Sequence, residues 1–171
     1  MKSIRRSNIY LAIMAMILTA ALAVPAGAQK QVPFKGEIQA LEAETGFVPP
    51  VTVLHAGSGT GIGSHLGQFT LTYDLTINVA NGTGTGFGHW IAANGDTIDV
   101  TIAGTAEPTG TPGILRVTEI YTITRGTGRF DGAQGSFVME RLVTVATGVT
   151  SGSFHGTITS PGAADAEADE D

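Results

Sequence analysis

The stretch from Gln68 to Val79 alternates strictly between polar and apolar residues. Every odd position from Phe69 onward is apolar, and every even position is polar. Only a β-strand places these two sets on opposite faces, because successive side chains of a strand point in opposite directions. This stretch therefore predicts a long strand with one buried face and one face in water, and it excludes a helix here.

Two further strands are predicted around Asn94-Gly95, a pair typical of a two-residue hairpin turn. Pairing across this turn places His89 opposite Val100 on the apolar face. It also places Trp90 and Asp99 together on the outer face. The preceding junction is predicted to be a three-residue loop, 81–83, because that loop keeps the apolar faces of the two flanking strands together.

A later hairpin is predicted from Ile114–Thr124 and Gly135–Ala146, joined by the loop Gly126–Gln134. Centring this loop brings the apolar positions of both strands onto one face and places Glu119 opposite Arg141. A slip of two residues satisfies the same pattern, since the side-chain period of a strand is two.

The sequence patterns that predict the remaining strands are weaker. Pro33–Leu41 and Gly152–Thr159 are predicted strands, Val51–Leu54 is either a short strand or part of a loop, and the glycine-rich Gly57–Gly63 is predicted to be a loop or bulge. The result is seven or eight consecutive antiparallel strands. We expect an all-β fold, an eight-stranded antiparallel up-and-down barrel over residues 29–160, because closure removes exposed strand edges. A β-sandwich is the structural alternative.

The first 28 residues have the layout of a secretory signal peptide. A basic start at Lys2, Arg5 and Arg6 precedes an apolar run, and the small residues Ala26-Gly27-Ala28 follow it. We expect cleavage after Ala28 and a secreted or periplasmic protein with no membrane contact afterwards. An uncleaved membrane anchor is the alternative.

Charge and cysteine content exclude several classes of protein. Three of the nine basic residues leave with the signal peptide, so six remain against fifteen acidic ones. Nucleic acid is therefore not an expected partner. The absence of cysteine excludes disulfides, thiol catalysis and cysteine-ligated metals. The acidic tail 161–171 has no large apolar residue and is predicted to be disordered.

A glycine-rich segment, Arg125–Phe137, carries a family resemblance. It reads Arg-Gly-Thr-Gly-Arg-Phe-Asp-Gly-Ala-Gln-Gly-Ser-Phe. It resembles the Gly-Thr-Gly-Arg-Phe-x-Gly-Ala-x-Gly signature of dirigent proteins, which allene oxide cyclases and secreted bacterial proteins with an allene-oxide-cyclase-like barrel share more loosely. The segments Val32–Gly36, His65–Thr70 and Ala93–Asp96 resemble the bacterial group. The resemblance implies an eight-stranded, calycin-like antiparallel barrel and a possible homo-oligomer. It assigns no active-site residue.

Sequence motifs for cofactors are absent. The chain has no Gly-x-Gly-x-x-Gly run and no phosphate-binding loop, and its four histidines lack local metal-ligand spacing. We therefore expect no cofactor and no metal.

Charged residues on predicted apolar faces mark the candidate site. Glu119 and Arg141 form either a buried ion pair that satisfies only itself or a polar cluster that orients a ligand. In the predicted registers His89 lies in the same layer of the barrel. The candidates are Glu119, Arg141 and His89 for catalysis, and Tyr73, Tyr121 and His65 for ligand binding.

Three functions fit this sequence. The first is a barrel that binds a small, mostly apolar molecule. The second is a cofactor-free cyclase or isomerase, or a dirigent-like guide of coupling chemistry, in which Glu119 or His89 acts as acid or base and Arg141 stabilises charge. The third is a structural or interaction barrel with a filled core. Small inward residues such as Ala93 and Gly104 favour a cavity.

Overall fold

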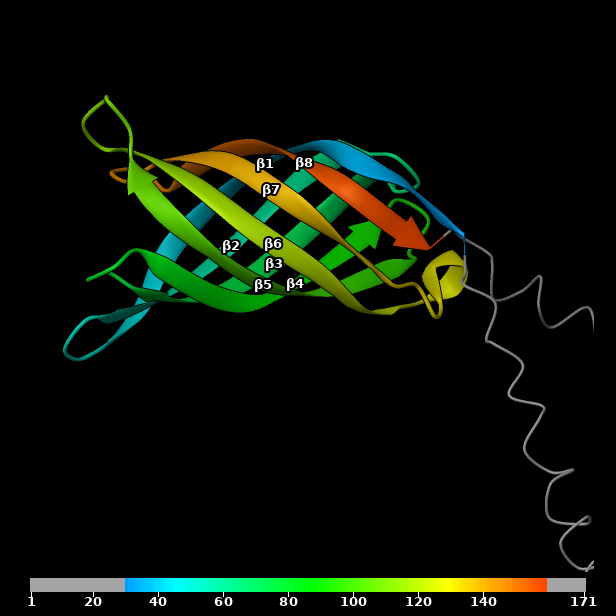
Figure 1. Ribbon diagram of the computed structural model, residues 1–171, viewed down its shortest axis with the longest axis horizontal. Coiled ribbons are helices and arrows are strands. Elements are labelled where there is room, and N and C mark those ends of the chain that lie inside the picture. The colour runs from blue at the N-terminus through cyan, green and yellow to red at the C-terminus, as the bar shows by residue number, and fades with distance from the viewer. Residues whose placement is uncertain (1–29, 160–171) are drawn as a thin grey trace, which may run out of the picture.

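The computed structural model describes residues 30–159, which form one closed antiparallel barrel (Figure 1). Its strands follow in chain order, and β8 pairs with β1 to close the sheet. They are β1 (Gln31–Val48), β2 (Thr52–Gly63), β3 (Gly67–Asn78), β4 (Thr83–Ala92), β5 (Thr97–Pro108), β6 (Ile114–Gly126), β7 (Gly135–Thr144) and β8 (Val149–Thr159). The prediction of an eight-stranded up-and-down barrel is confirmed, and the sandwich alternative is wrong. The predicted signal peptide and acidic tail lie outside the described residues.

The two ends of the barrel differ. At the closed end, the 3-10 turn η1 (Gly128–Phe130) lies beside the start of β1 and the end of β8, at the right of Figure 1. Phe130 is fully buried there. The other end, at the left of Figure 1, is called the open end and carries the turns 49–51, 79–82, 109–113 and 145–148. Within residues 30–159, no helix has the length and apolar character needed to span a membrane.

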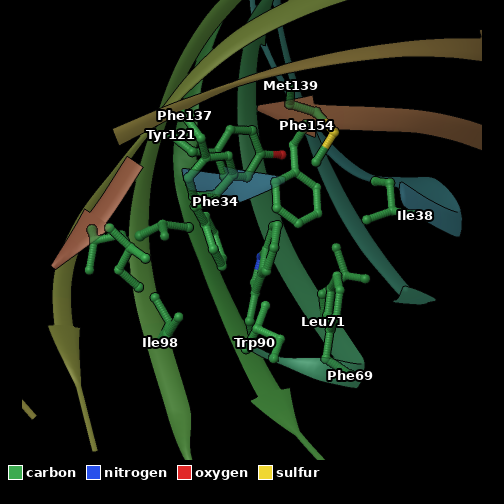
Figure 2. Packing of buried hydrophobic residues seen from close by; sticks show 14 of the residues in the cluster. Phe34, Ile38, Phe69, Leu71, Trp90, Ile98, Tyr121, Phe137, Met139 and Phe154 are labelled. Carbon is green, nitrogen blue, oxygen red and sulfur yellow. The ribbon is translucent and has the colours of Figure 1, made fainter. Parts of the chain in front are cut away.

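Aromatic rings fill the closed half of the barrel (Figure 2). Phe69 stacks on Trp90 with ring centroids 4.8 Å apart, and Tyr121 stacks on Phe137 at 5.0 Å. Phe154 contacts both Trp90 and Phe137. Such large rings supply most of the apolar area that a barrel of this size can bury. The closed half therefore has a packed interior.

Inward glycines make room for these rings. Gly57 lies under the ring of Tyr73 and Gly61 lies under the ring of Phe69, so a Cβ at either glycine would collide with the ring. The predicted loop or bulge over Gly57–Gly63 is therefore wrong, because this stretch belongs to β2. Glycine weakens a strand in isolation, but here the neighbouring strand covers it with an aromatic side chain.

The register of β4 differs from the prediction. Ile77 pairs with Gly84, so the turn 79–82 holds four residues instead of three. Trp90 consequently points inward and is 0% exposed, whereas Phe87 points outward and is 69% exposed. The reason is volume: the inward glycines leave space for neighbouring core side chains, with Gly84 beside Ile77, Gly86 beside Leu75, and Gly88 beside Val100 and the indole of Trp90. The predicted outer position of Trp90 is wrong.

Candidate functional site

A polar cluster interrupts the apolar interior between the aromatic half and the open end. Its centre is Arg141 on β7, which is 4% exposed. Arg141 does not lie opposite Glu119, because Val117 pairs with Arg141 and Glu119 pairs with Met139. The register is the two-residue slip that the sequence left open. The ion pair forms all the same, on the diagonal between neighbouring strands.

Arg141 donates two hydrogen bonds to Glu119. Its Nε donates to Oε2 and its Nη2 donates to Oε1, each over 3.0 Å. This fork-on-fork geometry gives the strongest form of a charged hydrogen bond. Tyr121 donates its hydroxyl to Glu119 Oε2 over 3.3 Å. Glu119 therefore has both carboxylate oxygens occupied.

A second carboxylate, Glu42 on β1, was missed by the sequence analysis. Arg141 Nη1 donates to Glu42 Oε2 over 2.7 Å, and the hydroxyl of Tyr73 donates to the same oxygen over 3.0 Å. The signal was available: Glu42 continues the even-numbered inward positions that begin with Phe34 and Ile38. The predicted strand ended at Leu41, one residue too early.

Burial sets the protonation of the two phenols. Desolvation and then the charge of Glu42 raise the pKa of Tyr73, while Arg141 opposes the shift. Desolvation and then the charge of Glu119 raise the pKa of Tyr121 well above its ordinary value. Burial alone lowers the pKa of Arg141, but its bonds to Glu119 and the charge of Glu42 outweigh this, so the pKa is raised. Both tyrosines therefore act as neutral hydrogen-bond donors.

One carboxylate oxygen of the cluster accepts no hydrogen bond from the described residues. Among the described residues, no hydrogen-bond donor reaches Glu42 Oε1, and His55 Nδ1 lies 3.6 Å from it. His55 Nδ1 is itself buried and lacks a hydrogen-bond partner within residues 30–159. The separation is too long for a hydrogen bond between them. His55 Nδ1 is closed off from solvent, so within this pair only the free oxygen of Glu42 is left for a further donor.

The open end lies on the other side of this cluster. Several inward positions there are partly exposed. They are apolar or small: Val53, Ile77, Gly84, Gly86, Gly104, Ala106 and Leu115. Ala93, which was predicted to face inward, is exposed and lies in the turn after β4.

Two predicted site residues lie outside the barrel. His89 is on the outer face of β4, where it contacts Asp99 of β5 and has a side chain 45% exposed. The one-residue shift in β4–β5 pairing that buries Trp90 also turns His89 outward. His65 is exposed in the turn between β2 and β3, with a left-handed φ of 65°. Their predicted places in the barrel are wrong, whereas Tyr73 and Tyr121 do join Glu119 and Arg141.

The outer wall of the barrel also has a concave surface. A shallow groove crosses the outer wall of the barrel, lined by outward side chains such as Gln39, Thr60 and Thr70. These side chains are exposed and already solvated, so the groove offers a ligand little. Within residues 30–159, no group of three or more His, Asp or Glu could hold a metal ion.

Comparison of the chain with family models, curated proteins and solved structures found no match. A function for this protein therefore rests on the geometry of the cluster and of the open end.

Proposed function

We propose that this protein is an exported β-barrel that binds a small, mostly apolar molecule through its open end. The apolar body of the ligand packs on inward residues such as Val53 and Ile77, and its polar end is directed toward Glu42. The resemblance to allene-oxide-cyclase-like and dirigent-like barrels supports a ligand inside the barrel, and the signal-like start of the chain supports export.

One observation carries this proposal. In this buried cluster three of the four carboxylate oxygens accept hydrogen bonds, whereas Glu42 Oε1 accepts none from residues 30–159. An unpaired buried polar group costs free energy, and a ligand that pairs it recovers that cost. A pocket with an apolar wall and a few convergent polar groups is the usual form of a small-molecule site.

The test places a bulky side chain inside the open end and compares it with the same side chain on the outer wall. Val53→Trp fills an inward position, whereas Leu54→Trp places the same ring on the outer wall, since adjacent residues of a strand face opposite sides. Binding is followed with the neutral fluorescent probe N-phenyl-1-naphthylamine. We expect Val53→Trp to abolish the fluorescence increase and Leu54→Trp to preserve it. Equal binding by both variants contradicts the proposed site.

A cyclase or isomerase is the second candidate. The neutral phenol of Tyr73 and the carboxylate of Glu42 lie in hydrogen-bond contact, which sets an acid beside a base. These two residues replace His89 in the role that the sequence suggested for it. Recovery of the bound molecule in two isomeric forms, with the ratio altered by Tyr73→Phe, distinguishes this candidate from simple binding.

A further inference from the structure

We propose that the protein docks on lipid bilayers through the rim of its open end, with the turns of this rim entering the headgroup region of an uncharged membrane. The inference concerns the outside of the rim, so it holds or fails independently of the ligand proposed inside the barrel. It replaces the sequence-based expectation of no membrane contact after export.

The rim carries no charged side chain. The four stretches that contain its turns, residues 45–54, 75–88, 108–115 and 142–154, have no Asp, Glu, Lys or Arg. The turns of the closed end differ, because they contain Asp96, Arg129 and Asp131. Soluble proteins usually place charged side chains on their surface, so a whole end without them suits an environment other than water.

Large apolar side chains are exposed on this rim. Phe47 precedes the first turn and is 53% exposed, Val79 in the second turn is 57% exposed, and Val145 in the fourth turn is 58% exposed. Backbone hydrogen bonds join neighbouring turns, since Val79 donates to the carbonyl of Val51 and Val145 donates to the carbonyl of Gly113. The apolar groups therefore lie on turns that are bonded to one another, and together they form an apolar edge.

Polar groups of the turns already have partners within the same turn. The side-chain oxygen of Asn81 accepts hydrogen bonds from both the amide and the hydroxyl of Thr83. The hydroxyl of Thr109 donates to the carbonyl of Ile114 over 2.9 Å. Leaving water is costly for a polar group that loses its hydrogen bonds, and much less so for one that keeps them. These groups can therefore enter a lipid interface with their hydrogen bonds intact.

A bilayer fits this rim better than a second copy of the chain does. Eight strands about 4.8 Å apart and tilted by about 40° give an end face of roughly 500 Å², below the about 800 Å² per partner of a standard protein interface. The turns also project unevenly at this end (Figure 1). A fluid lipid interface adapts to such an edge, whereas a folded partner must match its shape.

The lipid that fits is uncharged. Residues 30–159 carry ten acidic and six basic side chains, so an anionic membrane repels the barrel as a whole. Without a charge on the rim, adsorption rests on apolar contacts, and salt should leave it unchanged.

Flotation with phosphatidylcholine vesicles tests the docking. The protein is prepared in its expected exported form, which begins at Gln29, so that the apolar run before Ala28 cannot bind the lipid itself. We expect it to float with the vesicles equally at low and high salt, and no better when anionic phosphatidylglycerol is added. Failure to float with either lipid overturns the inference, and so does binding to the anionic vesicles alone. The probe experiment on Val53→Trp tests the proposed function without lipid, so the two failures are distinguishable.

Matched charge variants locate the contact. Val79→Glu combined with Val145→Glu adds two charges to the rim, whereas Ile62→Glu combined with Ile120→Glu adds two to the outer wall, at positions 60% and 57% exposed. The first pair should lower vesicle partitioning at least about ten-fold, because a charge must then leave water. The second pair should leave it unchanged. The emission of the buried Trp90 reports that both variants fold.

Equal effects of the two pairs on partitioning overturn the inference. So does a dimer in solution that the rim pair dissociates, in a protein that binds no vesicles, because that result assigns the rim to a second copy of the chain.

Discussion

At the scale of single residues, Arg141 matters more to the charge balance of the cluster than either of its two glutamate partners. Within residues 30–159 it is the only cation that contacts both buried carboxylates by hydrogen bonds, with two bonds to Glu119 and one to Glu42. Removal of Arg141 leaves two buried negative charges, whereas removal of either glutamate still leaves Arg141 paired. The consequences for stability should therefore differ.

Arg141→Met should lower the free energy of unfolding by about 3–5 kcal/mol, because buried charges lose their partner. Glu119→Gln should lower it by only about 1–2 kcal/mol, since Arg141 keeps Glu42 and a neutral acceptor remains. The double variant should recover part of the loss, and adding Glu42→Gln should recover more. Urea unfolding measures all four. A loss in Arg141→Met no larger than that in Glu119→Gln contradicts the arrangement.

The two buried phenols make stability depend on alkaline pH. Burial raises the pKa of Tyr73 and Tyr121 above the ordinary value, so the folded protein keeps protons that the unfolded chain loses near pH 10. The folded state then binds more protons, and stability falls as the pH rises above about 10, by up to about 1.4 kcal/mol per pH unit for each tyrosine. Below that pH the two phenols leave stability unchanged.

Urea unfolding at about pH 9 and about pH 11 measures this dependence. Tyr73→Phe and Tyr121→Phe should each flatten the slope, although each also loses a hydrogen bond to a glutamate. Phenolate absorbance should appear only as the protein unfolds. If phenolate absorbance appears near pH 10 while the protein is still folded, at least one of Tyr73 and Tyr121 is not buried.

At the scale of the strands, glycine and aromatic residues act as cross-strand partners. The interior of β2 is glycine-rich, and β3 supplies rings that lie over those glycines. The same arrangement recurs where the ring of Phe154 on β8 lies against Gly36 of β1. Cross-strand pairs of this kind stabilise a sheet that either strand alone would not form.

Gly57→Ala tests this pairing. The added methyl group collides with the ring of Tyr73, so the ring must move and its bond to Glu42 must weaken. We expect a loss of about 1–3 kcal/mol in the free energy of unfolding. Gly110→Ala is the matched control, because a Cβ there meets nothing within 4 Å and its φ is not left-handed. Similar losses in both variants would mean that the ring does not lie over Gly57.

At the scale of the whole molecule, the barrel has a dry half and a wetter half. The rings around Trp90 and Phe137 are fully buried, and η1 covers the closed end through Phe130. Inward positions such as Ile77 and Gly84 at the open end are partly exposed. Local opening should therefore cost more free energy at the closed end than at the open end.

Hydrogen exchange measures this difference. Amides of β4 near Trp90 should exchange only through global unfolding, whereas amides of β3 and β4 near Ile77 and Gly84 should exchange through smaller local openings. Addition of a ligand at the open end should slow the second group selectively. Uniform protection along β4 contradicts a barrel with two unequal halves.

Much of the architecture could be predicted from periodicity alone. Strict alternation identified the inward face of β3, and the charged interruptions of that pattern identified Glu119 and Arg141 as a pair. The site was predicted less well. Strand β4 has apolar residues on both faces and glycines at its inward positions, so its pattern could not decide between Trp90 and His89. In the folded barrel, burial of the indole places Trp90 on the inner face and His89 on the outer face.

The sequence by itself determined the consecutive antiparallel order of seven or eight strands and the existence of a charged pair in an apolar interior. These follow from local patterns, since turn signals and alternation act over a few residues. Only the tertiary structure decided the registers and the third member of the ion-pair network. Glu42 meets Arg141 across 99 positions of the chain because β1 and β8 close the barrel. Closure is a property of the complete sheet, and no local pattern contains it.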